Sequence, residues 1–180
     1  MVKLIELLGN KKPLQILLFL TAHPSQEFTY TELRKKTKLA KATLTKWLAF
    51  LGHQDLLAEQ KRGFQKFYRI NRNHVLVKQF KVLRAVASLD FLLALSKKHG
   101  FEAYLYGSAA RGEEVEESDL DIIIIGKVKK EELLPEIQRQ SALLKKEIRI
   151  RIFTPLEWAQ LSDNDKAFYE RVEKDKILLQ

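Results

Sequence analysis

The segment DLDIIII, residues 119–125, limits the folds open to this chain more than any other stretch. An apolar run of this length, bounded by charged residues, is typical of a buried strand. From Phe101 onward, short apolar or alternating segments are followed by amphipathic ones, which predicts strands and helices in turn. We therefore expect an α/β sheet domain of about 95 residues in the second part of the chain.

The expected elements of this part follow from the periodicity of each segment. Residues 147–154, EIRIRIFT, alternate strictly, as a strand does. Pro135 interrupts a helical pattern, so the helix starts either at residue 129 or, as proline favours, at Leu134. A long helical stretch, residues 71–100, precedes the sheet; it is broken near Ser88 and closed by Gly100. We predict strands over 101–106, 119–125, 147–154 and 177–179, and helices over 129–146, 155–161 and 163–175.

The net charge of +9 lies entirely in the first part of the chain. Residues 1–75 hold 14 Lys and Arg against 5 Asp and Glu, whereas residues 76–180 hold 18 of each. Such asymmetry indicates two domains, the first of which faces a polyanion or simply carries a solvated basic surface. We place the domains at 1–75 and 101–180, with connecting helices over 76–100.

The basic part reads as helices followed by a hairpin. A helix ends near Pro24, and Thr29 with Glu32 has the spacing of a capping box at the start of a second. The third helix, residues 40–54, has an apolar stripe that includes Leu44 and Trp47. A strand, a turn at Lys61–Gly63 and a second strand then form a hairpin with a basic tip.

This order of elements, over residues 8–72, resembles the winged helix-turn-helix family. The resemblance implies that the 40–54 helix enters the DNA major groove and that the hairpin contacts the backbone. DNA is then the expected partner of this domain. The residues that would reach base edges or phosphates are Lys41, Thr43, Thr45 and Lys46 on the helix, and Arg62 and Lys66 on the hairpin.

Two acids mark the start of the buried strand. Asp119 and Asp121 are two residues apart on a strand, so their side chains project from the same face. Two carboxylates this close repel each other and demand a cation; oxygen ligands of this kind suit Mg²⁺ together with substrate phosphates. Upstream, Gly107 lets the backbone approach closely, and its N–H with the Ser108 hydroxyl can hold a phosphate.

The segment GSAARGEEVEESDLD resembles the nucleotidyltransferase signature of the DNA polymerase beta superfamily: Gly-Ser, ten residues, Asp-x-Asp. Ala110-Arg111-Gly112 and Ser118-Asp119 also match its minimal prokaryotic members. The resemblance, over residues 85–180, implies transfer of a nucleoside monophosphate from a nucleoside triphosphate to an acceptor, with Mg²⁺ or Mn²⁺. It places Asp119 and Asp121 on the metal as catalytic residues, and nucleotide binding at Gly107, Ser108, Arg111 and Ser118, although Arg111 is also suited to bracing the loop. The other loop acids, Glu113, Glu114, Glu116 and Glu117, are expected to be solvated.

One position departs from the family pattern. Active members place a third carboxylate on a neighbouring strand, and here the count from Thr154-Pro155 puts Arg151 at that position. Either Glu147, on the same strand face, is the third catalytic acid, or the site binds nucleotide without turnover and Arg149 or Arg151 contacts phosphate. The strand and the FTPLEW segment after it resemble a subgroup of winged-helix fusions that often lack the third acid.

The fold class we expect is therefore α+β or α/β: a winged helix domain joined by a helix to a small mixed-sheet nucleotidyltransferase-fold domain. Function remains open between a DNA-binding nucleotidyltransferase, a nucleotide-sensing regulator and a protein-binding platform. Related small proteins modify a helical toxin, so a protein acceptor and a homodimer are among the expected partners. With no cysteine and no apolar run of membrane-spanning length, we expect a cytoplasmic protein.

Overall fold

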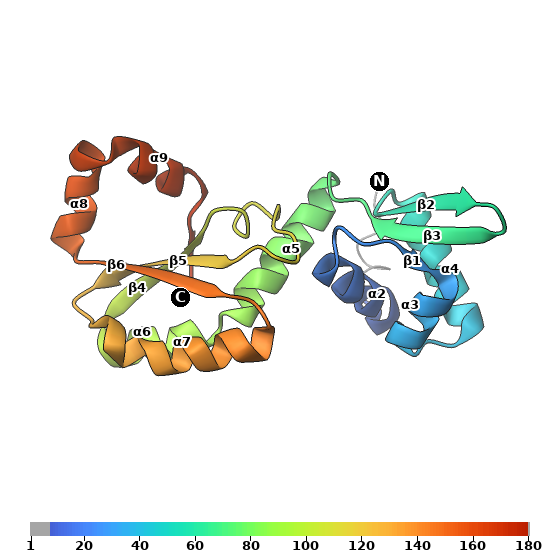
Figure 1. Ribbon diagram of the computed structural model, residues 1–180, viewed down its shortest axis with the longest axis horizontal. Coiled ribbons are helices and arrows are strands. Elements are labelled where there is room, and N and C mark those ends of the chain that lie inside the picture. Colours follow the sequence, from blue (N-terminus) through green and yellow to red (C-terminus); the bar gives the residue numbers. More distant parts are fainter. Residues whose placement is uncertain (1–7, 180) are drawn as a thin grey trace. The chain divides into compact units, whose positions relative to one another are not determined.

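The computed structural model describes residues 8–179. The chain forms two compact units that divide between Phe80 and Lys81 (Figure 1). Within the described range, no helix has both the length and the apolar character needed to cross a membrane.

The N-terminal unit has the winged-helix arrangement that the sequence predicts. Helices α2, α3 and α4 precede a hairpin, and a short strand before α3 joins that hairpin in an antiparallel sheet of order β1-β3-β2. Its elements are α2 (Lys11–Ala22), β1 (Phe28–Thr29), α3 (Tyr30–Thr37), α4 (Lys41–His53), β2 (Leu57–Arg62) and β3 (Gln65–Ile70).

Local signals fix the ends of α3. The Thr29 hydroxyl accepts from the Glu32 backbone N–H at 3.3 Å, and the Glu32 carboxylate accepts from the Thr29 N–H at 2.7 Å. This reciprocal pair is the predicted capping box, and it satisfies two donors that a helix start leaves unpaired. Lys38 ends the helix in the left-handed conformation with φ of 55°.

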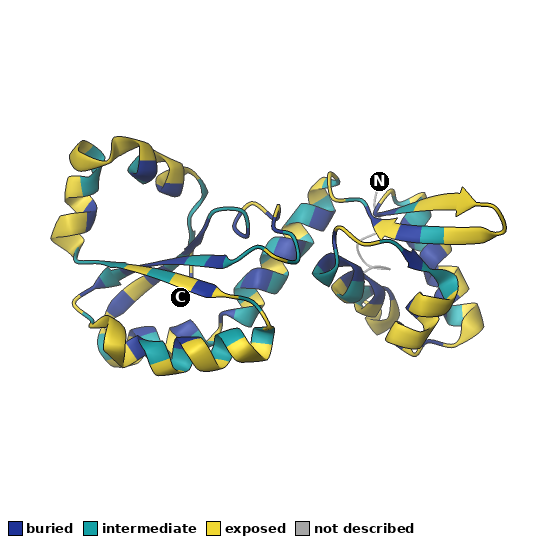
Figure 2. Cartoon of the chain, in the orientation of Figure 1, coloured by how far each residue is buried: buried dark blue, intermediate teal, exposed yellow. Residues whose placement is uncertain are grey.

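One face of α4 holds the core of this unit together. Leu44, Trp47, Leu48 and Leu51 are all buried, as their helical spacing predicts (Figure 2). They pack with buried residues of α2, α3 and the hairpin into one cluster. The remaining positions of α4 are left on the surface, where the predicted DNA-contacting side chains lie.

Two helices precede the second sheet. They are α5 (Val75–Ser88) and α6 (Phe91–His99), so the predicted break near Ser88 is confirmed. Gly100 ends α6 with φ of +69°, a conformation that glycine adopts without the steric cost that a side chain brings.

The C-terminal unit is built on a mixed sheet of order β6-β5-β4-β7. β5 is parallel to β6, whereas β4 is antiparallel to both β5 and β7. The elements are β4 (Phe101–Tyr106), β5 (Leu120–Gly126), α7 (Lys130–Leu144), β6 (Ile148–Phe153), α8 (Pro155–Asn164), α9 (Lys166–Asp175) and β7 (Ile177–Leu178). Together with the winged helix this confirms the predicted fold class.

Helices cover both faces of this sheet (Figure 1). On one face, Ile122 and Ile124 of β5 belong to a cluster with buried residues of α6 and α7. On the other face, Ile123 packs in a cluster with Trp158 of α8 and Phe168 of α9. The isoleucine run of β5 is therefore buried on both sides, which explains why it lacks the alternation of a half-exposed strand.

The prediction that α7 starts at Leu134 is wrong. The helix begins at Lys130 and continues through Pro135. Proline there removes one intrahelical N–H donor, but Leu133 and Ile137 are buried against the sheet on either side of it. Packing of that apolar face outweighs the local preference against proline.

Two glycine substitutions test this packing in opposite directions. A Cβ at Gly126 would lie 2.5 Å from the Phe101 Cβ on the paired strand, whereas a Cβ at Gly52 in α4 meets nothing within 4 Å. We expect Gly126→Ala to lower the free energy of unfolding by about 1–3 kcal/mol. Gly52→Ala should raise it by up to roughly 1 kcal/mol, because alanine favours a helix. Urea unfolding measures both; equal effects would contradict the strand register.

Candidate active site

The aspartate pair, Asp119 and Asp121, lies where β5 begins. Asp121 is the second residue of the strand and shares its face with Ile123, which α8 and α9 cover. Both aspartates are half-buried, in contrast to the fully buried isoleucines 122–124 that follow. The pair therefore sits at the margin of the covered part of this face, where a ligand can reach carboxylates on a rigid strand.

The turn after β4 comes close to this pair. Tyr106, the last residue of β4, is in register with Asp121, so Gly107 follows directly beside it. Gly107 has φ of +75°, and a Cβ there would lie 3.2 Å from the Asp121 Oδ2 atom. Only glycine meets both constraints without strain. The group that the Gly107 backbone approaches closely in the structure is the carboxylate of Asp121.

The residues after Gly107 fold into compact turns. The Arg111 N–H donates to the Gly107 carbonyl at 3.2 Å, and the Glu113 N–H donates to the Ser108 carbonyl at 2.8 Å. Ser108 is half-buried at the start of these turns. At the other end of the loop, the Ser118 hydroxyl accepts from the Val115 N–H at 2.9 Å. The structure thus brings Gly107 and Ser108 close to the aspartates, while Ser118 makes a contact inside the loop.

Arg111 is held at both ends of its guanidinium group. Nε lies 2.9 Å from Glu113 Oε2, and Nη1 lies 2.6 Å from Asp175 Oδ2 at the end of α9. These two hydrogen bonds raise the pKa of Arg111. The contacts of the side chain therefore connect the loop to α9.

Arginine approaches the aspartates from β6. In the parallel pairing, Asp121 lies opposite Arg149 and Ile123 lies opposite Arg151. Arg149 Nη1 is 2.7 Å from Asp119 Oδ2, and its Nε is 3.0 Å from Glu147 Oε1. Glu147, whose side chain is 60% exposed, reaches the pair only through this arginine. Arg149 thus neutralises part of the charge that two adjacent carboxylates create.

Comparison with protein families identifies the domain around this site. The model of the nucleotidyltransferase domain matches residues 89–179, just over half of the chain. The chain belongs to the nucleotidyltransferase domain family. A comparison with curated proteins gave no match.

Two solved structures resemble parts of the chain. Reduced HlyU from Vibrio cholerae N16961 is 27% identical, with a TM-score of 0.36, and the match covers 43% of this chain and 76% of HlyU. Rv0081 from M. tuberculosis is 21% identical, with a TM-score of 0.38, covering 52% and 87%. Both scores are low, so the description of the N-terminal fold rests on the order of its own helices and strands.

The charges of the nucleotidyltransferase domain shift the pKa of Asp121. Burial raises this pKa and the Asp119 carboxylate raises it further, while Arg149, Arg151 and Arg171 oppose the rise. Arg151 and Arg171 both lie over the Phe168 ring, at 4.9 and 5.5 Å from its centroid. Three arginines from β6 and α9 therefore surround two carboxylates, an arrangement that attracts both a cation and an anion.

The donor set fits a metal that arrives with a nucleotide. No cluster of three or more His, Cys, Asp or Glu side chains among residues 8–179 is placed to hold a metal ion. Mg²⁺ does not need such a cluster, since one or two carboxylates plus substrate phosphates often bind it. Asp119 and Asp121 would supply the two carboxylates, and Gly107 places no side chain against Asp121 Oδ2, where a Cβ would lie at 3.2 Å. Arg149 is exposed, and an exposed ion pair is weak because solvent screens it, so a ligand can displace it.

Sequence reasoning missed the buried charges beneath the loop. The prediction that Glu114 is solvated is wrong: the residue is 1% exposed and its carboxylate lies 3.1 Å from Arg84 Nη2. Lys81 of α5 is equally buried. The sequence does indicate the burial of Lys81, because this residue lies at the i+4 position in an otherwise apolar stripe of Val77, Ala85 and Leu89.

The predicted DNA-contacting residues lie together on α4 and the hairpin. Lys41, Thr45 and Lys46 are exposed and Thr43 is half-buried. The Tyr30 hydroxyl donates to the Lys41 carbonyl at 2.9 Å and lies 3.2 Å from the Thr45 hydroxyl, which ties α3 to α4. On the hairpin, Arg62 pairs with Glu27 at 2.8 Å and Lys66 with Glu59 at 2.6 Å.

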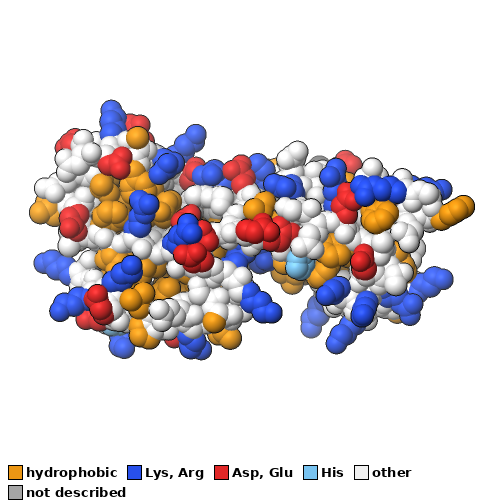
Figure 3. Space-filling model, viewed as in Figure 1, with side chains coloured by type: hydrophobic (Ala, Val, Ile, Leu, Met, Phe, Trp, Pro, Cys, Tyr) orange, Lys and Arg blue, Asp and Glu red, His pale blue; other side chains and the backbone are white. Residues whose placement is uncertain are grey.

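A second basic group on α3 escaped the sequence analysis. It consists of exposed side chains beside the turn to α4, and Lys and Arg atoms gather over this part of the unit (Figure 3). The residues are Arg34, Lys35, Lys36 and Lys38.

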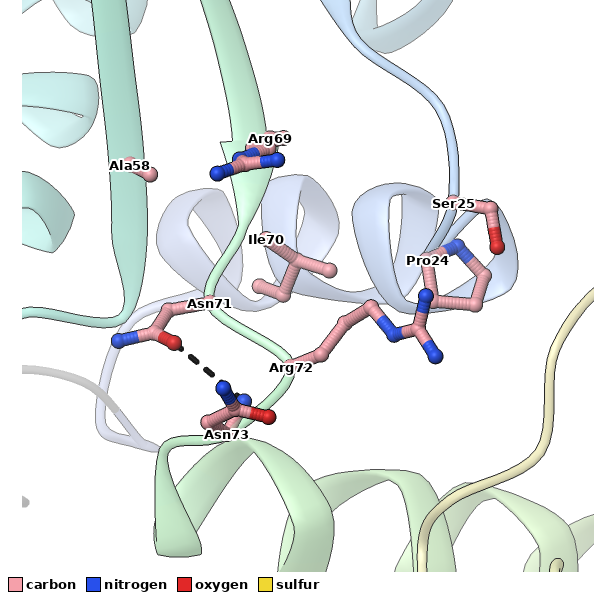
Figure 4. Close-up of a pocket in the computed structure, with 8 residues that line it drawn as sticks. All are labelled: Pro24, Ser25, Ala58, Arg69, Ile70, Asn71, Arg72 and Asn73. Carbon is pink, nitrogen blue, oxygen red and sulfur yellow. Dashed lines mark hydrogen bonds between the residues drawn. The ribbon is translucent and has the colours of Figure 1, made fainter.

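A separate pocket of about 300 Å³ lies in the N-terminal unit (Figure 4). Arg69 and Arg72 contribute guanidinium groups to it, and the Asn73 N–H donates to the Asn71 side chain at 3.3 Å. No Asp, Glu or His side chain lines this pocket, so it has no carboxylate or imidazole to bind a metal or accept a proton.

The raised pKa of Asp121 predicts that this side chain destabilises the free protein at neutral pH. A carboxyl whose pKa is higher in the folded state stabilises the fold below its unfolded pKa. That contribution is lost as the pH rises through the folded value. Asp121→Asn should therefore raise the melting temperature at pH 7 but not below about pH 3.9.

Calorimetry in metal-free buffer across this pH range measures the effect. Asp163→Asn, at an exposed position of α8, is the matched control and should follow the wild-type profile at every pH. An Asp121→Asn variant that melts below wild type at pH 7 would show that its arginine neighbours outweigh burial.

Proposed function

We propose that this protein transfers a nucleoside monophosphate from a nucleoside triphosphate to an acceptor hydroxyl. The observation that carries the proposal is the approach of Gly107 to Asp121, because it sets a phosphate-binding turn directly against a pair of carboxylates. The Gly107 backbone N–H and the Ser108 hydroxyl would hold the phosphates. Asp119 and Asp121 would hold Mg²⁺ or Mn²⁺ with oxygen atoms of the triphosphate.

The bound metal would neutralise the developing charge and align the α-phosphorus for in-line attack by the acceptor hydroxyl, with pyrophosphate as the leaving group. Asp119 is paired with Arg149, so this pair would have to break before Asp119 could hold the metal. The released guanidinium of Arg149 would then face the phosphates. Arginine suits this exchange because its planar donors match carboxylate and phosphate alike. Arg111, anchored on Asp175, keeps the loop in place, so its role in nucleotide binding is indirect in this proposal.

Glu147 is the candidate for the third catalytic acid. It lies on the strand next to the aspartates and would accept the proton of the acceptor hydroxyl. The hydrogen bonds from Arg149 lower the pKa of Glu147, which makes it a weaker base while that contact lasts. Release of Arg149 to the phosphates would restore its basicity.

A second function is supported by the same arginine. If Arg149 stays on Asp119, it occupies one of the two carboxylates that would hold the metal, while Arg151 and Arg171 remain for phosphate. The site would then bind nucleotide without turnover, and the protein would be a nucleotide-sensing regulator. The two functions differ in one observable, the movement of label from the nucleotide to an acceptor.

The N-terminal unit supports a DNA-binding role in both cases. We propose that α4 lies in the major groove with Lys41, Thr43, Thr45 and Lys46 toward the DNA, and that Arg62 and Lys66 contact the backbone. The exposed cations of α3 add positive charge on the same helix-turn-helix. An acceptor protein and a second copy of the chain are further candidate partners, to be included in the acceptor panel.

Transfer of α-labelled ATP in the presence of Mg²⁺ tests the enzyme. The wild-type protein should label an acceptor in a panel of nucleic acids and proteins, itself included. Asp119→Asn should reduce the labelling rate at least roughly 100-fold, because it removes a charged metal ligand. Asp90→Asn, an exposed aspartate at the start of α6, should leave the rate unchanged. Saturable nucleotide binding without any label transfer would instead establish the regulator.

Duplex DNA binding at several salt concentrations tests the winged helix. Lys46→Ala should weaken binding and reduce the slope of log affinity against log salt by about one unit. Lys97→Ala, an exposed lysine of α6 in the other unit, is the matched control. Equal affinity and slope for Lys46→Ala and wild type would rule out α4 as the DNA-contacting helix.

A further inference from the structure

A buried lysine lies beneath the loop that joins the phosphate-binding turn to the aspartates. Lys81 of α5 is 1% exposed, which makes it the largest of the fully buried side chains among the described residues. Its Nζ donates to the Gly112 carbonyl at 3.0 Å and to the Glu114 carbonyl at 2.5 Å. The Glu114 carboxylate lies 3.4 Å from the same nitrogen. The ammonium thus has its contacts on the middle of the loop.

Burial of this charge is costly, which makes its contacts informative. An ammonium in the interior loses its hydration and is tolerated only when its donors are satisfied and its charge is paired. Here two backbone carbonyls take two donors, and the buried Glu114 carboxylate, itself paired with Arg84, supplies the opposite charge. A methionine would fill the same space at lower cost. The lysine is therefore better explained by what it holds than by packing.

A second lysine holds the end of the loop. Lys146, just after α7, donates to the Val115 carbonyl at 2.9 Å and to the Ser118 carbonyl at 3.0 Å. Ser118 directly precedes Asp119. The loop is thus fixed by lysine–carbonyl bonds at its centre and at its end, and by the turns after Gly107 at its start.

We propose that Lys81 is a positioning residue that holds loop 107–119 in its nucleotide-binding conformation before the nucleotide arrives. This inference rests on the proposed nucleotide site. The turn with Gly107 and Ser108 and the aspartate pair lie at opposite ends of this loop, so its conformation sets their spacing. A loop ordered in advance spares the nucleotide the entropic cost of ordering it. The Glu114 carboxylate serves to neutralise Lys81, and the carbonyl bonds do the positioning.

Three variants separate positioning from stability. Lys81→Met removes the carbonyl bonds and leaves Glu114 buried without its ammonium, so the melting temperature should fall by at least roughly 10 °C. Lys81→Met with Glu114→Gln also removes the buried carboxylate, whose remaining partner is Arg84, and should regain part of that loss. Glu114→Gln alone keeps both carbonyl bonds. Lys98→Met, at an exposed position of α6, is the matched control.

The affinity for Mg²⁺-ATP is then measured by calorimetry at a temperature where each variant is folded by circular dichroism. We expect Kd to rise roughly tenfold or more in both variants that lack Lys81, including the restabilised double variant. Kd should stay within roughly threefold of wild type in Glu114→Gln and Lys98→Met. A double variant that binds like wild type would overturn the proposal, because affinity would then follow stability.

Hydrogen exchange of the wild-type protein without nucleotide gives a test that needs no variant. The amides of Gly112, Glu113, Val115 and Ser118, which donate hydrogen bonds within the loop, should be protected comparably to those of β5. Exchange of these amides within seconds would show that the loop is not ordered in advance and would overturn the proposal. If wild type binds no nucleotide at all, the proposed function fails. Protected loop amides would then still show that loop 107–119 is ordered without nucleotide.

Discussion

Burial of β5 from both sides is the constraint on which the rest of the C-terminal unit depends. The apolar side chains of the isoleucine run are buried only if helices cover both faces of the sheet. On one face, the cover that α8 and α9 provide ends at Ile123. Where that cover ends, the strand carries Asp121 instead of an apolar residue. The same partial burial that anchors the strand also raises the pKa of this carboxyl. The site is thus a product of the core's edge, since the strand is rigid there but still accessible.

Three cationic side chains contact the residues at this edge of the core: Arg149, Lys81 and Lys146. Arg149, on the neighbouring strand, forms an ion pair with Asp119. Lys81 and Lys146 donate hydrogen bonds to backbone carbonyls of the loop. Their exposures differ, and so do their consequences. An exposed ion pair such as that of Arg149 is weak and exchangeable. A buried ammonium cannot leave without a large penalty, so it acts as a permanent part of the architecture. The domain therefore combines the exposed, replaceable Arg149 with the buried Lys81, which stays in place.

Local patterns in the sequence were enough to predict much of this molecule. The β5 strand and the Thr29–Glu32 capping box both depend on residues within a few positions of one another. Contacts set by register or by long sequence separation were not predictable in this way. The Arg149–Asp119 pair depends on how β6 aligns with β5, and Lys81 meets Glu114 across 33 positions. The helix through Pro135 forms because the sheet packs against it, which no local preference reveals.

The hairpin of the N-terminal unit carries acids beside its bases, and this has a consequence for selectivity. Glu27 and Glu59 serve as internal counterions to Arg62 and Lys66. A polyanion that docks there swaps one carboxylate partner for one phosphate, and the electrostatic gain of that swap is small. Any chain of negative charges is thus a poor competitor unless its spacing lets both bases be re-paired together. Because these ion pairs are exposed and therefore weak, two phosphates at a matching spacing would replace both carboxylates together.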